Sequence, residues 1–201
     1  LSKTATFLVP ASIRYLLHFA STRLSHLSDQ IDFIETGASA ISHSDMQLLC
    51  RLLPKSRLYN TYASTETGII STYNFNDGKC IPMCLGKPMK HAQITINETG
   101  HVVCSGSTLM SGYAGDESLT QSVLQKGKIT TSDLGYLDDE GRLQLEGRSG
   151  DIINIGGYKV NPLEVEDAAM GYPGIKDCIC IPSFHPILNV TIKLLISLSE
   201  E

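Results

Sequence analysis

Two charged side chains, Asp133 and Arg148, lie fifteen residues apart and flank a turn-rich segment, residues 138–141. The alternating residues on either side of that segment predict a β-hairpin, in which Asp133 ends a strand and both side chains reach one polar ligand. A glycine pair, Gly156-Gly157, follows where the backbone can bend or approach a ligand closely. This pattern predicts a ligand clamp beside a hinge. The alternative is an ion pair at the base of the hairpin, which contributes little if it is exposed.

A second group of polar residues, positions 62–68, follows a short apolar stretch. Tyr62 offers a flat face for a nucleobase, Thr65 a hydroxyl for a phosphate oxygen, and Glu66 a carboxylate for a hard cation such as Mg²⁺. A segment of this kind is more often a solvated loop, so the sequence leaves both interpretations open here. The histidines and cysteines are dispersed without the spacing of a zinc site, which favours cysteines buried as small apolar residues.

The chain begins with an alternation of helices and strands that should position these groups. A helix is predicted from Pro10 to residue 24, a strand over 31–35, and a second helix from Ser42 to Pro54 with Asp45 in its capping box. A strand over 57–60 then completes a βαβ unit, which indicates a parallel sheet. Ligands of open α/β sheets lie beyond the carboxyl ends of the strands, where the loops 36–40 and 61–68 are expected.

The pattern changes to hairpins further along the chain. Strands are predicted over 93–96 and 101–104, and again over 134–137 and 142–145, each pair joined by turn residues. Asn161, Pro162 and Glu164 mark the start of a helix, and two strands follow over 175–181 and 189–198. The expected fold is α/β and β. It comprises a partial parallel α/β unit (1–79), a small β-barrel-like subdomain (80–149) and the start of an α+β C-terminal domain (150–201).

Composition excludes several classes of protein. The net charge is −5 and no basic run exists, so a nucleic-acid partner is not expected. The chain lacks an apolar stretch of roughly 20 residues that could span a membrane, and lacks a secretory signal, so a cytoplasmic location is expected. The chain starts without methionine and stops directly after an apolar strand, which suggests part of a longer protein.

Several motifs, in order along nearly the whole chain, resemble those of the adenylate-forming enzymes, which include acyl-CoA synthetases and the adenylation domains of peptide synthetases. Residues 62–66 resemble the family's Tyr-Gly-x-Thr-Glu, and residues 131–133 its Thr-Gly-Asp. Residues 147–154 and 156–160 resemble its hinge. Further matches are Thr36-Gly37-Ala38, Ser111-Gly112-Tyr113 and the segment 162–166.

The resemblance implies a nucleotide site. Gly37, Ala38 and Tyr62 would enclose the adenine, and Asn60 would bond to its edge. Asp133 would accept bonds from both ribose hydroxyls. Thr65 would bind the α-phosphate and Glu66 would bind Mg²⁺. Arg148 would support the ribose and phosphate side. The resemblance implies that these three residues, Thr65, Glu66 and Arg148, are catalytic.

The resemblance also implies a hinge at Gly150, about which Gly157 and Tyr158 would move to meet the pantetheine arm of a thiol acceptor. The family has Asp or Lys at that hinge, and glycines where Ala63 and Ser132 stand. The family's phosphate loop, with its lysine, and its C-terminal catalytic lysine have no counterpart in these 201 residues.

The expected reaction joins a carboxylic acid to ATP, giving an acyl-adenylate and pyrophosphate, and then passes the acyl group to a thiol, with coenzyme A as the expected acceptor. One alternative is transfer to a carrier-protein phosphopantetheine, which Asn60-Thr61-Tyr62 favours slightly. The other is a degenerate adenylation fold that binds without turnover. The 201-residue chain by itself is expected to be inactive, because both lysines lie outside it.

Overall fold

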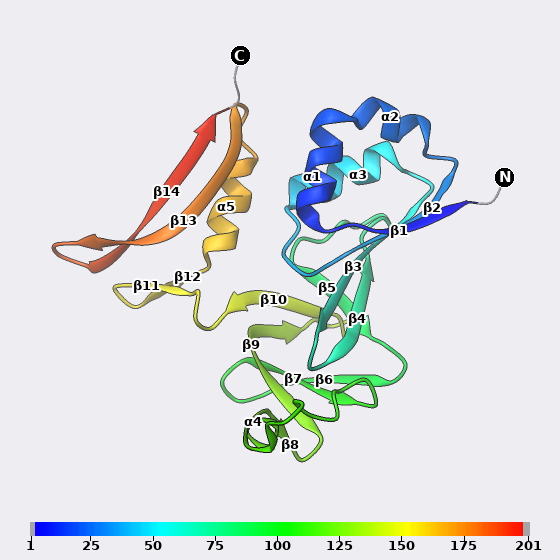
Figure 1. Cartoon of the computed structure of the whole chain (residues 1–201). Coiled ribbons are helices and arrows are strands. Elements are labelled where there is room, and N and C mark those ends of the chain that lie inside the picture. The colour runs from blue at the N-terminus through cyan, green and yellow to red at the C-terminus, as the bar shows by residue number, and fades with distance from the viewer. Residues whose placement is uncertain (1–2, 199–201) are drawn as a thin grey trace. The chain divides into compact units, whose positions relative to one another are not determined.

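The computed structural model describes residues 3–198 and divides into two compact units, residues 1–145 and 146–201 (Figure 1). The domain boundaries predicted near residues 80 and 150 stay predictions. Each unit is described by itself.

The first unit is built on a mixed sheet whose strands follow the order β1-β2-β3-β4-β5-β10-β9-β7-β6, with β8 paired to β9. Strands β1 (Thr4–Phe7), β2 (Ile31–Thr36) and β3 (Arg57–Ser64) are parallel, which confirms the predicted βαβ unit. Strands β4 (Gly68–Asn74) and β5 (Cys84–Pro88) then pair antiparallel. The carboxyl ends of β2 and β3 therefore lie at one edge of the parallel part, as expected.

Three helices accompany the parallel strands: α1 (Pro10–Phe19), α2 (Ser21–His26) and α3 (His43–Leu52). The single helix predicted from Pro10 to residue 24 is wrong, because Ala20 adopts φ −139° and leaves the helical region. The hydroxyl of Ser42 accepts from the amide of Asp45 and caps α3 as predicted. The apolar faces of these helices pack into one core, formed by Ile13, Leu17, Leu24, Ile34, Met46, Leu49, Leu53, Leu58 and Phe75 together with further buried neighbours.

Strand β3 is longer than its sequence suggested. It continues to Ser64, so residues 61–64 are strand and not loop, and Thr61 and Tyr62 pair with Thr72 and Ser71 of β4. A β-branched and an aromatic residue suit a paired strand, and the pairing with β4 overrides the loop-like composition of the segment. The turn between β3 and β4 is therefore short and covers residues 65–67.

The predicted hairpins are present as β6 (Ala92–Ile96) with β7 (His101–Gly106), and β9 (Lys128–Leu137) beside β10 (Leu143–Arg148). Helix α4 (Glu117–Val123) and the short β8 (Leu124–Gln125) precede β9. Asp133 lies within β9 and not at a strand end, because β9 is ten residues long. A second core contains residues of these strands and of β4 and β5: Ile70, Leu85, Ala92, Ile94, Val102, Cys104 and Leu143.

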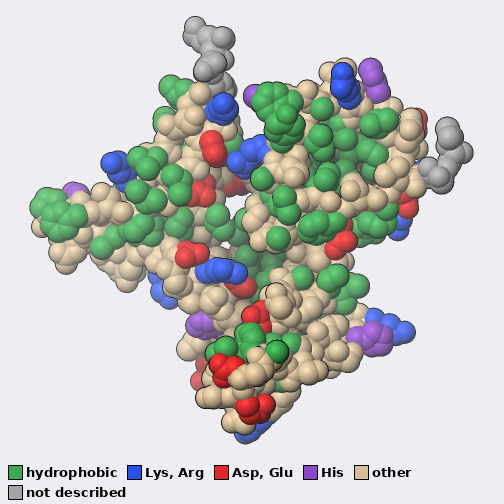
Figure 2. All heavy atoms as spheres, viewed as in Figure 1, with side chains coloured by type: hydrophobic (Ala, Val, Ile, Leu, Met, Phe, Trp, Pro, Cys, Tyr) green, Lys and Arg blue, Asp and Glu red, His purple; other side chains and the backbone are tan. Residues whose placement is uncertain are grey.

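The second unit contains two hairpins and a helix: β11 (Ile153–Ile155) with β12 (Tyr158–Val160), α5 (Pro162–Met170), and β13 (Ile175–His185) with β14 (Asn189–Leu198). The side chain of Asn161 accepts from the amide of Leu163 and caps α5 as predicted. Hydrophobic side chains gather on the surface of the β13–β14 hairpin (Figure 2), where Phe184 is 79% and Ile187 84% exposed. Across residues 3–198, every helix is too short or too polar to cross a membrane.

Candidate functional site

A hydrogen bond between Tyr62 and Asp133 joins two distant parts of the sequence. The phenol of Tyr62 in β3 donates to Oδ2 of Asp133 in β9 over 2.6 Å. Asp133 is only 8% exposed. Its amide donates to the hydroxyl of Thr131, which itself donates to the carbonyl of Val102. The carboxylate is thus held at a fixed position beside an aromatic ring.

The chemistry of the Tyr62 hydroxyl matches this geometry. Burial raises the pKa of Tyr62 well above its usual value of 10, and the adjacent Asp133 carboxylate raises it further. The phenol therefore remains protonated and donates to Asp133 across the whole physiological pH range. A carboxylate that accepts such a bond stays in place while it recognises a further hydroxyl donor.

The loop after β2 packs closely on the same part of β3. A Cβ atom on Gly37 would lie 2.8 Å from the carbonyl oxygen of Thr61, so a side chain there would collide with the backbone next to Tyr62. Ala38 follows with φ 69°, a left-handed conformation that is uncommon for residues other than glycine. Ala38 is exposed at this turn. The structure therefore places the Gly37-Ala38 loop beside the strand that carries Tyr62.

Hydroxyl groups fold the turn that carries Thr65 and Glu66. The amide of Ser64 donates to the Thr67 hydroxyl, and the amide of Thr67 donates to the Ser64 hydroxyl, each over 3.1 Å. Thr67 is buried, whereas Thr65 is exposed at the tip. The turn is thus closed from within by Ser64 and Thr67, and Thr65 faces solvent.

The carboxylate of Glu66 is held by a residue 47 positions further along the chain. Tyr113 donates its hydroxyl to Oε1 of Glu66 over 2.9 Å, and the carbonyl of Glu66 accepts from the amide of Met110 over 2.8 Å. The bond from Tyr113 is the largest of several hydrogen bonds that lower the pKa of Glu66, so the carboxylate is ionised at neutral pH. An ionised carboxylate beside a hydroxyl is suited to a hard divalent cation.

Replacing Tyr113 with phenylalanine should raise the pKa of Glu66 toward its ordinary value of 4.5, because the principal hydrogen bond to the charged form is lost. Carbon-detected NMR titration of the Glu66 side chain measures this change directly. Tyr136→Phe, at an exposed tyrosine, is the matched control and should leave the pKa of Glu66 where it is. An unchanged Glu66 titration in Tyr113→Phe would contradict the assigned contact.

Asn60 lies two residues before Tyr62 on β3 and is 7% exposed. Its amide nitrogen is 3.5 Å from the carbonyl oxygen of Cys84 in β5, which gives a long hydrogen bond to the strand beyond β4 in the sheet order. A role at the edge of an adenine ring stays a prediction.

The remaining predicted residues belong to the second unit. Arg148 is the exposed last residue of β10, and its carbonyl accepts from the amides of Asp151 and Ile152, which forms a turn around Gly150. Gly156 and Gly157 have φ 58° and 98° and form the turn between β11 and β12, with Tyr158 beside it and 80% exposed. The predicted roles of Arg148, Gly157 and Tyr158 stay predictions, since they require a position relative to the first unit.

The first unit thus brings Gly37, Tyr62 and Asp133 together around the second half of β3, and Glu66 lies in the turn that follows directly. Asp133 and Tyr62 are in contact, and their roles toward a nucleotide stay predictions. The contacts of Tyr113 with Glu66 and of Thr131 with Asp133 were not predicted. In the sequence, Tyr113 and Thr131 were marked only as members of the motifs at residues 111–113 and 131–133.

The sequence of the chain is similar to those of known enzymes. The family model described as AMP-binding enzyme matches residues 1–114. A mitochondrial acyl-coenzyme A synthetase, ACSM3 of Rattus norvegicus, is 30% identical over 159 residues, which cover 72% of this chain and 27% of the relative. A 3,4-dihydroxybenzoate–[aryl-carrier protein] ligase of Bacillus anthracis is 29% identical over 152 residues, 70% of this chain and 32% of the relative.

The fold also agrees with solved structures. The crystal structure of ATP-bound MatB from Rhodopseudomonas palustris superposes with a TM-score of 0.83 at 22% identity, over 98% of this chain and 41% of that protein. This confirms the predicted mixed α/β architecture. The chain therefore spans about a third of the length of these relatives. The family match extends over more than half of the sequence, and the chain belongs to the AMP-binding enzymes, an adenylate-forming family, as its motifs predicted.

Proposed function

We propose that this chain is the nucleotide-binding part of an ATP-dependent carboxylate ligase. In the complete enzyme a carboxylate oxygen attacks the α-phosphorus of ATP, the bond to pyrophosphate breaks, and an acyl-adenylate forms. A thiolate then attacks the acyl carbon and AMP leaves. The observation that carries the proposal is the hydrogen bond between Tyr62 and Asp133, which sets an aromatic ring beside a buried carboxylate.

This contact supports the proposed adenosine half of the site. The adenine lies between the Tyr62 ring and the Gly37-Ala38 loop, and Asn60 approaches its edge. Asp133 accepts hydrogen bonds from the two neighbouring ribose hydroxyls, a geometry that suits a single carboxylate. The ring of Tyr62 and the carboxylate of Asp133 are held in place before the nucleotide binds, so little conformational entropy is lost on binding.

The phosphate half of the site is the turn after β3. Thr65 donates its hydroxyl to the α-phosphate, and Glu66 supplies an oxygen ligand to Mg²⁺. The residues fit this ion, because Mg²⁺ is typically held by one or two carboxylates together with phosphate oxygens, and Glu66 is ionised and partly exposed. When bound, Mg²⁺ neutralises charge on the phosphates. For Arg148 the proposed role is to offset the negative charge that develops on the phosphates in the transition state.

The acyl acceptor is proposed to be coenzyme A. The proposed location of the enzyme is the cytoplasm. The rat relative is named as an acyl-coenzyme A synthetase, which supports this acceptor, whereas the Bacillus anthracis relative is named for an aryl-carrier protein. The exposed turn of Gly157 and the exposed ring of Tyr158 are the proposed contacts for the pantetheine arm of either acceptor. Asn60-Thr61-Tyr62 is the feature that favours a carrier protein.

Titration of the purified chain with AMP tests the proposal. AMP should bind, and adenosine should retain much of that affinity, because the base and ribose contacts belong to residues 1–145. GMP should bind more weakly, since its base edge differs. NMR shifts on AMP addition should include Gly37, Tyr62 and Asp133. Equal affinity for AMP and GMP, or shifts confined to other residues, would contradict the proposal. Pyrophosphate release by the full-length protein then separates an active ligase from a binding protein without turnover.

A further inference from the structure

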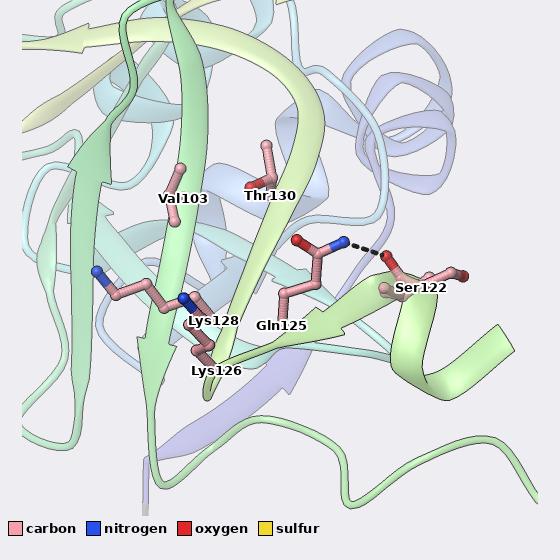
Figure 3. A pocket seen from close by; sticks show the side chains of 7 residues that line it. Val103, Ser122, Gln125, Lys126, Lys128 and Thr130 are labelled. Atoms are coloured by element: carbon pink, nitrogen blue, oxygen red, sulfur yellow. Dashed lines mark hydrogen bonds between the residues drawn. The ribbon is translucent and has the colours of Figure 1, made fainter. Parts of the chain in front are cut away.

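A cavity lies in the first unit, and its lining contains none of the residues proposed to contact adenosine. It has a volume of about 490 Å³ and is lined mainly by Val103, Ser122, Gln125, Lys126, Lys128 and Thr130 (Figure 3). Its size falls within the range of about 300–1,000 Å³ that is usual for small-molecule sites. Thr130 and Lys128 alternate along β9 with the inward-facing Thr131 and Asp133, so the cavity opens on the opposite face of that strand.

The lining is cationic on a protein whose net charge is −5. Lys126 and Lys128 extend in the same direction from the turn between β8 and β9 (Figure 3). The described lining contains no Asp or Glu. Two carboxylates at the start of α4 are engaged locally: the N-cap residue Asp116 accepts from the amide of Leu119, and Glu117 accepts from the side chain of Gln121. The positive charge of the cavity is therefore not offset within its own wall.

The backbone conformation of Lys126 is an independent indication that its side chain has a role in binding a ligand. Gln125 pairs with Lys128, so Lys126 and Gly127 are the two central residues of a tight hairpin turn, with φ 50° and 72°. Both positions of such a turn require positive φ, and asparagine or glycine is the usual residue at the first. A lysine there is strained. Strained residues gather at ligand sites, because the strain is tolerated where the side chain has a role.

We propose that this cavity binds a small anion that carries phosphate groups. The residues that line the cavity offer the ammonium groups of Lys126 and Lys128 and the hydroxyl of Thr130 as donors, and charged donors of this kind suit a tetrahedral oxyanion with several charged oxygens. The side-chain amide of Gln125 donates to the carbonyl of Ser122 over 3.0 Å (Figure 3). The inference does not depend on the proposed ligase activity, because it uses other residues and another face of β9.

Calorimetric titration of the 201-residue chain with inorganic pyrophosphate, inorganic phosphate and glycerol 3-phosphate tests the proposal. Binding should weaken with added salt. Lys128→Gln and Lys126→Gln should each lower the affinity about tenfold, as expected for loss of a charged hydrogen bond. Lys90→Gln removes the same charge from an exposed position outside the cavity and should leave the affinity unchanged. NMR shifts should include Val103 and Thr130 and leave Tyr62 and Asp133 unmoved.

Lys126→Asn separates recognition from folding. It should lower the affinity as Lys126→Gln does, while it raises the melting temperature by about 2 °C because asparagine suits the turn. Tighter binding of pyrophosphate than of glycerol 3-phosphate would identify a free diphosphate as the ligand, and the reverse order a phosphate ester. Absence of binding for all three anions, or binding that survives the Lys126→Gln/Lys128→Gln double variant, would overturn the proposal.

Discussion

Replacing Asp133 with alanine should lower the affinity of the chain for AMP at least tenfold. In the proposed site this carboxylate accepts hydrogen bonds from two ribose hydroxyls, and a hydrogen bond to a charged group contributes about 1.5–3 kcal/mol. The loss of one such bond corresponds to more than a tenfold change in the dissociation constant, and the loss of both to considerably more. Calorimetry or a fluorescent AMP analogue provides the measurement.

Two further variants decide what the loss of affinity means. Asp139→Ala removes the same charge from an exposed turn residue of the first unit, and AMP affinity should stay as in the unchanged chain. Tyr62→Phe keeps the ring beside the adenine but removes the 2.6 Å bond to Asp133. Its effect should be smaller than that of Asp133→Ala, because the carboxylate is still present but less firmly held. If Asp133→Ala bound AMP normally, the ribose assignment would be refuted.

The melting temperature of Asp133→Ala must be measured alongside its affinity, because Asp133 is buried and accepts a bond from Tyr62. The alanine leaves the phenol of Tyr62 without this acceptor, which costs about 1–3 kcal/mol if no water replaces it. A variant that still melts cooperatively but binds AMP weakly supports the assigned role. A variant that binds weakly only because it is partly unfolded would recover its affinity for AMP on cooling. This recovery would count against the assigned role of Asp133.

The sequence predicted most of the framework that carries this site. The βαβ unit was predicted because its apolar residues follow the helical and strand periods and because Ser42 and Pro54 bound its helix. The break at Ala20 was missed, because apolar residues keep a helical spacing across it. A short backbone change at one alanine leaves no signature in the pattern of side chains.

The site itself was predicted less completely, for a different physical reason. Tyr62 and Asp133 were named from motifs, but their contact joins strands 71 residues apart, and periodicity carries no information about which strands become neighbours. The same holds for Tyr113 and Glu66. The loop predicted over residues 61–68 failed because pairing with β4 extended β3 through Ser64. Tertiary contacts of this kind override local composition.

Substitution of Gly86 with alanine should have the largest effect on stability. Gly86 is buried in β5 at φ 76°, and a Cβ atom there would lie 1.9 Å from the carbonyl oxygen of Thr72, well inside contact distance. The obstacle is backbone and not a flexible side chain, so the strand itself would have to move. We expect the free energy of unfolding to fall by more than about 3 kcal/mol, from left-handed strain and steric overlap together.

Gly78→Ala is the matched control for Gly86→Ala. Gly78 also has a positive φ, 99°, but a Cβ atom there meets nothing within 4 Å. Its cost should therefore be the conformational strain by itself, about 1–2 kcal/mol. Urea denaturation followed by far-ultraviolet circular dichroism measures both variants. Equal losses for the two alanines would show that the backbone of Thr72 yields easily, and would contradict the steric argument.

The position of Gly86 also links stability to the proposed nucleotide site. In the sheet order β5 lies between β4 and β10. Gly86 pairs with Leu143 of β10, and the next residue of β5, Lys87, pairs with Thr72 of β4. Tyr62 on β3 and Asp133 on β9 therefore lie on opposite sides of β5 in that order. A displaced β5 should change the separation of the two residues and weaken AMP binding, although Gly86 touches neither of them. AMP affinity retained by a destabilised but folded Gly86→Ala variant would show instead that the Tyr62–Asp133 contact does not depend on β5.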